Sequence, residues 1–434
     1  MKQLLLFIVG VLCIEKAFPA GWQSLHYGMD QYVQTIYIDS ANNKIYAGGY
    51  FQYADSINVN NIAVWDGIGW DSLGSGNNGS LYCMSITSYQ GQIYADGRFG
   101  GSQFANFGGK FNQTNWDTLG FGVNGNLIQM KEIDNELWVS GQFYKVDNDS
   151  CKMLAKYDGA NWTCLNFPYE IGGRIEDFLI YNDTLVCGGL FSDSTNYHVG
   201  ISYFNGSQFQ ILGHRLYGAI AGVHSMVIFR GELYIAGYFL ASAGNEGNHI
   251  MRWDGSSWHD VGGGVDDEIY ILNVYNDELY AGGVFQNAGG VHTGNLAKWN
   301  GTTWSAVTPS IISPIIYDIQ FYQDEIYIGG AFRYIDSIPM NFIAKHALHT
   351  NVNEFKNDLL LKVYPVPSSD NLTVEITQSI IQRIYIKDIS GKLIKTFSFN
   401  ISKCEIDIST LASGIYIIEV MCEKETIRKK FVKN

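Results

Sequence analysis

Residues 46–51 of this 434-residue chain read Tyr-Ala-Gly-Gly-Tyr-Phe, and variants of that phrase return along the sequence. Successive copies end in phenylalanines that are 44 to 48 residues apart. Self-similarity at such a period is typical of folds built from one repeated supersecondary unit. The seven copies end at Phe51, Phe99, Phe143, Phe191, Phe239, Phe285 and Phe332.

A second phrase follows most glycine phrases and defines the rest of the unit. In Trp65-Asp66-Gly67 an aromatic residue precedes a tight-turn dipeptide, and Trp70 follows. Asp-Gly and Asn-Gly tolerate positive φ and favour short hairpins. Another short turn, such as Asn42-Asn43, precedes each glycine phrase. Each unit is therefore expected to be a four-stranded antiparallel meander, the blade of a β-propeller. The glycine pairs suit a crowded position near the propeller axis, and the recurrent aromatics suit packing between blades.

The last unit stops after Phe342-Ile-Ala-Lys-His346, without a fourth strand. The stretch Trp22-Gln-Ser-Leu25 matches the missing phrase, as in Trp70-Asp-Ser-Leu73. The sequence thus predicts an all-β fold, a seven-bladed β-propeller over residues 21–350 that is closed by the N-terminal strand. Its pattern resembles the kelch and galactose-oxidase central-domain propellers, a likeness that is specific for architecture and weak for function.

The N-terminal 20 residues have the pattern of a signal peptide. Lys2 precedes an apolar run over 4–14, and Ala20 offers a cleavage position. No later stretch approaches the length of a membrane-spanning helix, so none is expected in the mature form. The net charge of −14 disfavours nucleic acid as a partner.

Six cysteines follow Cys13, and none forms a Cys-x-x-Cys pair, so the sequence offers no zinc site. No metal or cofactor is expected. Export would permit disulfides. If the chain turns back near Ser413, Cys404 and Cys422 would lie opposite each other. Otherwise the cysteines are buried small hydrophobes, which is favoured for Cys83 and Cys187.

A linker is expected over 351–362, and residues 363–434 form a region of different composition. From Asn357 onward the chain carries 11 Lys and Arg against 9 Asp and Glu. Alternating strands predict a small Ig-like β-sandwich. Four phrases in order resemble the C-terminal sorting domain of type IX secretion substrates in Bacteroidetes. The resemblance implies export to the cell surface or release, with the secretion machinery as partner. Its motif residues are Tyr364, Pro365, Pro367, Asp388, Gly391, Lys392, Leu411, Gly414, Tyr416, Lys429 and Lys430.

Candidate ligand residues on the propeller are few. Asp96 and Arg98 interrupt the second glycine phrase and could face the channel, or they could form a local salt bridge. Asp147 and Asp149 lie in an oxygen-rich loop that could bind calcium or could be a solvated turn. The longer loops expected at the channel mouth are 53–60, 145–151, 241–248 and 287–293.

No catalytic constellation is present in the sequence, so two functions stay open. The first is a non-catalytic binding or adhesion protein, secreted or displayed on the outer membrane, with an unknown glycan or protein as extracellular ligand. The alternative is a secreted polysaccharide hydrolase or lyase with its site at the channel mouth. Two carboxylates in an open cleft would favour a glycosidase.

Overall fold

The computed structural model describes residues 21–76, 82–98, 107–147, 149–169, 173–195, 197–218, 221–308, 312–348, 361–376, 380–388, 393–422 and 426–433. The expected signal peptide 1–20 lies outside these residues, as does most of the linker 351–362. The chain divides into two compact units, Ala20–Leu348 and a unit that holds His349–Asn434. The described secondary structure is all β apart from the short 3-10 turn η1 (Ala241–Ala243).

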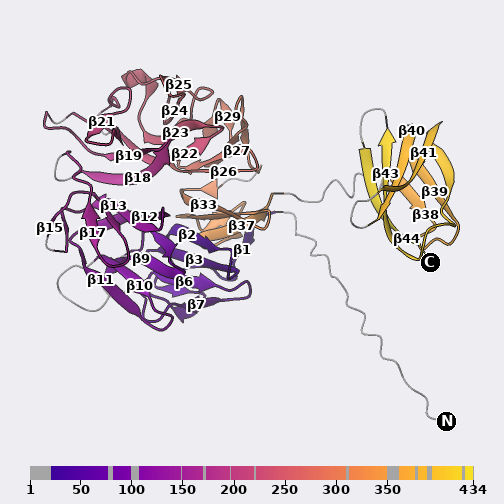
Figure 1. Cartoon of the computed structure of the whole chain (residues 1–434), viewed down its shortest axis with the longest axis horizontal. Helices are drawn as coiled ribbons and strands as arrows, with labels where there is room; N and C mark the ends of the chain where they lie inside the picture. Colours follow the sequence, from indigo (N-terminus) through magenta and orange to yellow (C-terminus); the bar gives the residue numbers. More distant parts are fainter. Residues whose placement is uncertain are drawn as a thin grey trace, which may run out of the picture. The chain divides into compact units, whose positions relative to one another are not determined.

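The described part of the unit Ala20–Leu348 contains seven antiparallel sheets of four or more strands, which we number repeat sheets 1 to 7 in chain order. In Figure 1 the strands run from indigo to orange along this unit. Repeat sheet 1 consists of β2 (Val33–Asp39), β3 (Lys44–Gly49), β6 (Ile62–Trp65) and β7 (Trp70–Ser72), and repeat sheet 2 is built on β8 (Ile86–Tyr89), β9 (Gln92–Arg98), β10 (Phe107–Phe111) and β11 (Trp116–Val123). Repeat sheet 3 consists of β12 (Asn126–Ile133), β13 (Glu136–Gln142), β16 (Leu154–Tyr157) and β17 (Trp162–Cys164). Repeat sheet 4 consists of β18 (Arg174–Tyr181), β19 (Thr184–Leu190), β20 (Ile201–Phe204) and β21 (Phe209–Ile211).

Repeat sheets 5 to 7 follow the same order of strands. They consist of β22 (Gly222–Phe229), β23 (Glu232–Tyr238), β24 (Ile250–Trp253) and β25 (Trp258–Asp260); β26 (Ile269–Tyr275), β27 (Glu278–Gly283), β30 (Leu296–Trp299) and β31 (Trp304–Ala306); β33 (Ile316–Tyr322), β34 (Glu325–Gly330), β37 (Ile343–Ala347) and β1 (Gln23–Ser24).

Short strands lie in the connections between the main strands, and all but β32, which precedes β33, lie between a second and a third strand. Two of them, β14 (Lys145–Val146) and β15 (Asp149–Ser150), extend repeat sheet 2 through β11. The others form small separate sheets: β4 (Tyr53–Ala54) with β5 (Ile57–Asn58), β28 (Asn287–Ala288) with β29 (Val291–His292), and β32 (Ile312–Ser313) with β35 (Tyr334–Ile335) and β36 (Ile338–Pro339).

The N-terminal strand completes repeat sheet 7, as the sequence predicted. Gln23 on β1 lies opposite Lys345 on β37. Just before it, the Nε1–H of Trp22 donates to Thr308 Oγ1 at 3.1 Å. The first strands also pack against one another in cyclic order, and β33 packs against β2. The two ends of the repeat array therefore meet in one sheet.

Fourth-strand tryptophans link neighbouring sheets. The Nε1–H of Trp116 donates to the carbonyl of Leu73 at 2.8 Å, just beyond the fourth strand of the preceding sheet. Trp304 does the same to Val261 at 2.8 Å. Trp70 donates to Leu25 at 3.0 Å, which joins repeat sheet 1 to repeat sheet 7. In these three tryptophans the ring packs between sheets while its one polar atom is hydrogen-bonded, whereas the Nε1 of Trp162 in repeat sheet 3 has no such partner among the described residues.

Where the phrase holds two glycines, as at Gly48 and Gly49, the two are crowded for different reasons. A Cβ on Gly48 would lie 2.7 Å from Cys83 Sγ, which belongs to the next repeat. A Cβ on Gly49 would lie 2.1 Å from the carbonyl oxygen of Tyr32, beside the first strand of the same sheet. The first glycine therefore permits close packing between sheets, and the second permits close pairing within one.

The C-terminal unit consists of two antiparallel sheets around one hydrophobic core. One sheet holds β38 (Leu361–Tyr364), β39 (Asn371–Ile376) and β42 (Lys403–Asp407); the other holds β41 (Leu393–Ile401), β40 (Ile381–Asp388), β43 (Gly414–Cys422) and β44 (Thr426–Lys433). Both sheets contribute to the core, for example Leu372 and Ile418 with no exposed surface.

The cysteines differ from one expectation. Cys404 lies on β42 and Cys422 on β43, in different sheets, so the strands that carry them do not pair with each other. Both side chains are buried in the core of the C-terminal unit. The disulfide in the described structure joins Cys151, in the connection before β16, to Cys164 at the end of β17, the outermost strand of repeat sheet 3. Sequence spacing alone did not reveal this pair, because the strands between them set the distance.

Candidate functional site

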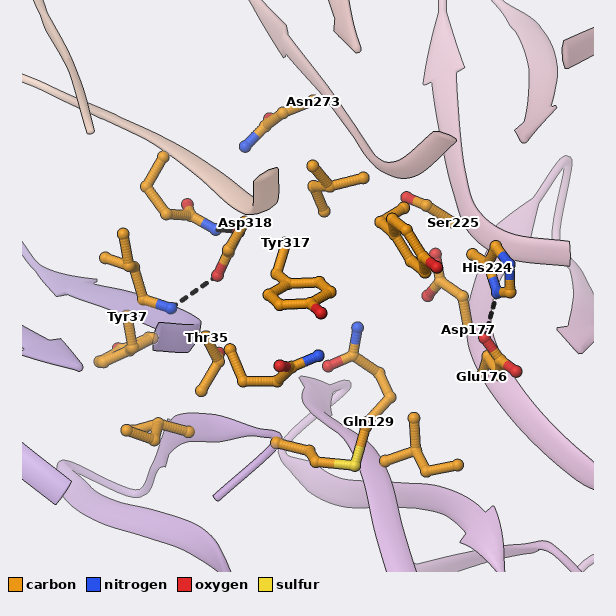
Figure 2. A pocket seen from close by; sticks show the side chains of 18 of the residues that line it. Thr35, Tyr37, Gln129, Glu176, Asp177, His224, Ser225, Asn273, Tyr317 and Asp318 are labelled. Atoms are coloured by element: carbon orange, nitrogen blue, oxygen red, sulfur yellow. Dashed lines mark hydrogen bonds and ion pairs between the residues drawn. The ribbon is translucent and has the colours of Figure 1, made fainter. Parts of the chain in front are cut away.

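A cavity of about 520 Å³ lies among the first strands of the repeat sheets. Its wall includes residues from β2, β12, β18, β22, β26 and β33, so strands far apart in sequence share it. Figure 2 shows side chains from several sheets pointing toward this space. The cavity is therefore a product of the whole array rather than of any one repeat.

Irregular pairing in the first strands directs specific side chains into the cavity. In β22 the register against β23 shifts between Val223 and Ser225, and His224 lies in the shift. The same shift flanks Glu176 on β18 and Tyr270 on β26. A bulge adds a residue to one strand and turns its side chain away from the regular alternation. The bulge positions thus supply three ionisable side chains of the cavity wall, Glu176, His224 and Tyr270.

Glu176 and His224 line the cavity and belong to a chain of charged groups that continues beyond its wall. His224 Nδ1 lies 2.5 Å from Glu176 Oε2, and its Nε2 lies 3.6 Å from Glu268 Oε2. Arg174 Nε lies 2.6 Å from the other oxygen of Glu176. This group of four, Arg174, Glu176, His224 and Glu268, is called the charged chain below. It joins repeat sheets 4, 5 and 6.

The ionisation of the charged chain follows from its contacts. Burial alone would lower the pKa of His224, but the Glu176 and Glu268 carboxylates outweigh it and raise the pKa to about 9. Burial opposes the ionised form of Glu176, yet His224 and Arg174 hold its pKa below the usual range. The contact with His224 also lowers the pKa of Glu268. At neutral pH the chain therefore holds two cations and two carboxylates.

Tyrosines extend from the charged chain across the cavity. Tyr270 stacks on His224 with ring centroids 5.1 Å apart, and Tyr317 meets Tyr270 edge-on at 5.4 Å. Burial raises the pKa of Tyr317, with a further effect from nearby Tyr32 and Tyr50. These last two are 43% and 38% exposed. The cavity thus combines an aromatic part with a charged part, a pairing common in ligand sites.

Asp96, for which the sequence left open a ligand role in the channel or a local salt bridge, is buried with 1% of its surface exposed. Its Oδ1 accepts the backbone N–H groups of Met84 and Ser85 at 2.6 and 3.0 Å. Burial raises the pKa of this carboxyl to about 7. The Asp96 carboxylate therefore organises the inner strand of its own repeat. Arg98 ends β9, and its side chain lies outside what the structure describes. A ligand role for either residue stays a prediction.

The loop residues Asp147 and Asp149 flank the β14–β15 hairpin. Asp147 has a positive φ of 51°, as the turn requires, and Asp149 is exposed on β15 opposite Val146. In the described residues, no group of three or more His, Cys, Asp or Glu side chains could hold a metal ion. Calcium binding by this loop stays a prediction that the structure does not test.

The motif residues of the C-terminal unit lie at strand ends and in its core. Tyr364 ends β38, and its hydroxyl donates to Glu375 at 2.8 Å. Pro365 and Pro367 follow in cis peptide bonds. Asp388 ends β40 opposite Tyr416, whereas Gly391 and Lys392 lie outside the described residues.

The remaining motif residues belong to the β43–β44 hairpin and the turn before it. Leu411 is buried and Gly414 begins β43. Tyr416 stacks on Phe431 at 5.7 Å. Lys429 and Lys430 lie on β44 opposite Ile418 and Ile417. These positions connect the phrases of the motif to one folded hairpin.

The charged chain was not among the residues predicted from sequence. Glu176 directly follows the buried Ile175 and His224 the buried Val223, each at the register shift of a first strand and so at the same place in their repeats. Aligning that place across the repeats would have exposed the ionisable pair. The bulge that turns these residues inward has no short sequence signature, so their meeting could not be inferred.

Two models of known protein families match parts of the chain. Residues 362–434 match the secretion system C-terminal sorting domain, which confirms the resemblance drawn from its four phrases. Residues 106–276 match the Rax2 C-terminal beta propeller domain. No curated protein matches the chain. Among the described residues, no helix is long and apolar enough to cross a membrane.

Several solved structures resemble the chain at low identity. PorZ, described as an essential bacterial surface component of the type-IX secretion system of Porphyromonas gingivalis, is 12% identical, with a TM-score of 0.46 over 93% of this chain. The extracellular domain of BT4673 from B. thetaiotaomicron is also 12% identical, with a TM-score of 0.45 over 93% of this chain. The chain spans 59% and 57% of these two chains.

A computationally designed protein, Ika8, is 11% identical with a TM-score of 0.42, and the match covers 94% of this chain and 98% of that one. The family matches, rather than these structures, define the parts of the molecule. The chain is an all-β protein in which a β-propeller domain precedes a secretion system C-terminal sorting domain, and that sorting domain implies export by type IX secretion.

Proposed function

We propose that this protein is exported by type IX secretion to the bacterial surface or beyond, where its propeller binds an extracellular glycan or protein without catalysing a reaction. In this proposal residues 1–20 are a signal peptide that is removed. Residues 21–350 form the propeller, 351–362 a linker, and 363–434 the domain that the secretion machinery recognises. The source is a member of the Bacteroidetes.

Export is supported by the sorting-domain match over residues 362–434. The Cys151–Cys164 disulfide agrees with it, because such bonds persist in oxidising compartments such as the periplasm and cell surface. Tyr364, Leu411 and Tyr416 occupy structured positions in the C-terminal unit, as residues that form a recognised fold should.

A closed ring of seven kelch-like blades is the architecture we propose for the propeller. Its support is the cyclic packing of the first strands and the pairing of β1 with β37. The Trp70 bond to Leu25 repeats the Trp116 bond to Leu73 across the place where the chain ends meet. For the C-terminal unit we propose an Ig-like sandwich, supported by its two antiparallel sheets and shared core.

The observation that carries the binding function is the His224 imidazole between Glu176 and Glu268. An acid that protonates a leaving group needs a carboxyl with a raised pKa near the substrate. Both carboxyls here have lowered pKa values, because each contacts the imidazolium. Among the described residues, the raised carboxyl pKa values belong to Asp96 and to Asp318, which lines the cavity; both are buried and accept backbone N–H groups, so their oxygens are already engaged. Fixed charges beside tyrosines suit recognition better than proton transfer.

Export is tested by deleting residues 357–434. The full chain should be labelled by a membrane-impermeant reagent on intact cells or found in the medium, and the truncated chain should remain in the periplasm. Surface labelling of the truncated chain equal to that of the full chain would overturn the sorting role.

Binding is tested with the purified full chain on a glycan and extracellular-protein array. A positive signal should fall at least about tenfold in His224→Ala and Tyr317→Ala, since both alter the cavity, and should persist in Ile68→Ala, whose side chain is 78% exposed in the turn between β6 and β7. Hydrolysis or eliminative cleavage of an array polysaccharide by the full chain, abolished by Glu176→Gln, would replace binding with catalysis.

A further inference from the structure

A second cavity, of about 620 Å³, lies on the outer part of repeat sheet 4. Its wall comes from the connection between β19 and β20, which holds Tyr197, and from residues 211–218 between β21 and β22. It shares no residue with the cavity that contains the charged chain. We call it the repeat-4 pocket. Its size is in the range of small-molecule sites.

Aromatic rings form the accessible part of the repeat-4 pocket. His214 and Tyr217 stack with ring centroids 5.5 Å apart and planes 24° from parallel. Tyr197 is 66% exposed and Tyr217 is 46% exposed, far more than the tyrosines that pack between sheets. Burying large rings normally stabilises a fold, so two rings left at a cavity are available for contact with another molecule.

The connection that carries these rings is held in place. The Asn245 side chain accepts the backbone N–H of Tyr217 at 3.0 Å and donates to its carbonyl at 2.9 Å. Leu216 is buried against Gly200, where an added Cβ would lie 2.5 Å away. A rigid wall loses less conformational entropy when a ligand binds.

Two basic side chains of the pocket, Arg215 and His214, already contact carboxylates. Arg215 forms an ion pair with Asp193 and lies over the Tyr197 ring at 5.9 Å. His214 Nε2 lies 2.9 Å from Glu246 Oε2. Thr195 and Arg215 contacts lower the pKa of Asp193 to about 2, so the Arg215 pair persists across ordinary pH. A charged ligand would have to break one of these pairs.

We propose that the repeat-4 pocket binds a neutral saccharide. A pyranose ring presents C–H groups on one face and hydroxyls around its edge. The exposed rings of Tyr197 and Tyr217 suit contact with the C–H face. The side chains of Arg215, His214 and Glu246, which already contact one another or a carboxylate, offer hydrogen-bond donors and acceptors to the hydroxyls, and this contact needs no charge on the ligand. The site is separate from the central cavity, although it rests on the proposed role as a binding protein.

The test uses the purified full chain and four neutral trisaccharides as probes: maltotriose, cellotriose, mannotriose and chitotriose, with sialyllactose as the charged comparison. Calorimetry should detect at least one neutral trisaccharide. Its dissociation constant should rise about tenfold or more in Tyr197→Ala and in Tyr217→Ala, whereas Tyr197→Phe keeps the ring and should stay within about threefold.

Tyr334→Ala is the matched control, because Tyr334 is 55% exposed on β35, in the connection between β34 and β37. It should bind like the wild type, and all four variants should keep the wild-type unfolding midpoint. The proposal is overturned if no neutral trisaccharide binds, if sialyllactose binds more tightly than all four, or if both tyrosine-to-alanine variants bind normally. Loss of trisaccharide binding in Tyr317→Ala alone would overturn the assignment to the repeat-4 pocket and would leave the central cavity as the proposed binding site.

Discussion

Asp177 on β18 accepts the backbone N–H of Met226 on β22 at 2.7 Å. The contact has counterparts around the array: Asp318 accepts from Ile36 at 2.6 Å and Ser225 accepts from Leu272 at 3.0 Å. Each first strand is the edge of its sheet, so its outward amides lack a strand partner. A side chain from the preceding sheet supplies the missing acceptor. The sheets are therefore joined by polar contacts as well as by apolar packing.

Removing one such acceptor should destabilise the propeller. Asp177→Ala leaves the amide of Met226 without its acceptor and removes the carboxylate that lies 2.6 Å from the Lys131 ammonium, which keeps its bond to the Phe178 carbonyl. We expect the free energy of unfolding to fall by about 2–4 kcal/mol. Urea unfolding followed by circular dichroism measures it. Glu132→Ala, an exposed change on a neighbouring strand, should shift the midpoint by less than about 0.5 kcal/mol.

Closing the array depends on Gly329. An alanine there would place its Cβ 2.6 Å from Val33 Cγ1, across the boundary between repeat sheets 7 and 1. Overpacking of this kind costs about 1–3 kcal/mol, so Gly329→Ala should unfold at lower urea concentration. Gly69→Ala is the control, since nothing lies within 4 Å of its added Cβ. Equal stability of the two variants would mean that sheets 7 and 1 do not pack as described.

The N-terminal strand should matter as much as an internal one. Trp22 is 8% exposed and bonds Thr308, and Trp304 occupies the same place in repeat sheet 6 and bonds Val261. Truncating either to alanine should lower the free energy of unfolding by about 3 kcal/mol or more. Chemical unfolding of the two variants compares them directly. A Trp22→Ala protein as stable as the wild type would contradict the pairing of β1 with β37.

The charged chain predicts how stability depends on pH. Folding raises the pKa of His224 from 6.5 to about 9, so its stabilisation is complete below about pH 6.5 and is lost as pH rises through 9. The Glu176 and Glu268 carboxylates create that preference, and Arg174 and the Tyr270 ring are the other groups that face this cluster. We expect the wild type to lose about 1–3 kcal/mol between pH 6.5 and 9.5 through this group.

His224→Gln should remove that part of the pH dependence. The difference in melting temperature between wild type and variant should be largest near pH 6 and should shrink by pH 9.5. His292→Gln, a change at an exposed position on β29, is the control and should leave the wild-type profile intact. A constant difference at every pH would show that His224 contributes packing rather than charge.

Much of the architecture was predictable because it depends on local chemistry. The Asp66-Gly67 turn and its counterparts tolerate positive φ, and each fixes a hairpin whatever surrounds it. The phrase that begins at Trp22 predicted the strand that completes repeat sheet 7. The last repeat lacks its fourth strand, which leaves an unpaired sheet edge that the N-terminal strand can fill. The ordered phrases after Tyr364 likewise indicated the sorting domain.

The sites were not predictable in the same way. Asp96 was correctly seen as unusual, but its carboxylate turned toward the Met84 and Ser85 amides, a choice made by neighbouring backbone rather than by composition. The repeat-4 pocket likewise needs Tyr197 and Tyr217, from two connections, to face one space.

The sequence by itself determined the repeating unit, the order of its strands and the presence of a C-terminal sorting domain, since hydrophobic alternation and turn chemistry act over a few residues. Only the tertiary structure decided that Glu176, His224 and Glu268 meet. Those residues are separated by whole repeats, and their contact depends on the twist and bulges of three sheets. Contacts of that kind arise from the packing of sheets around a common centre, which no single repeat encodes.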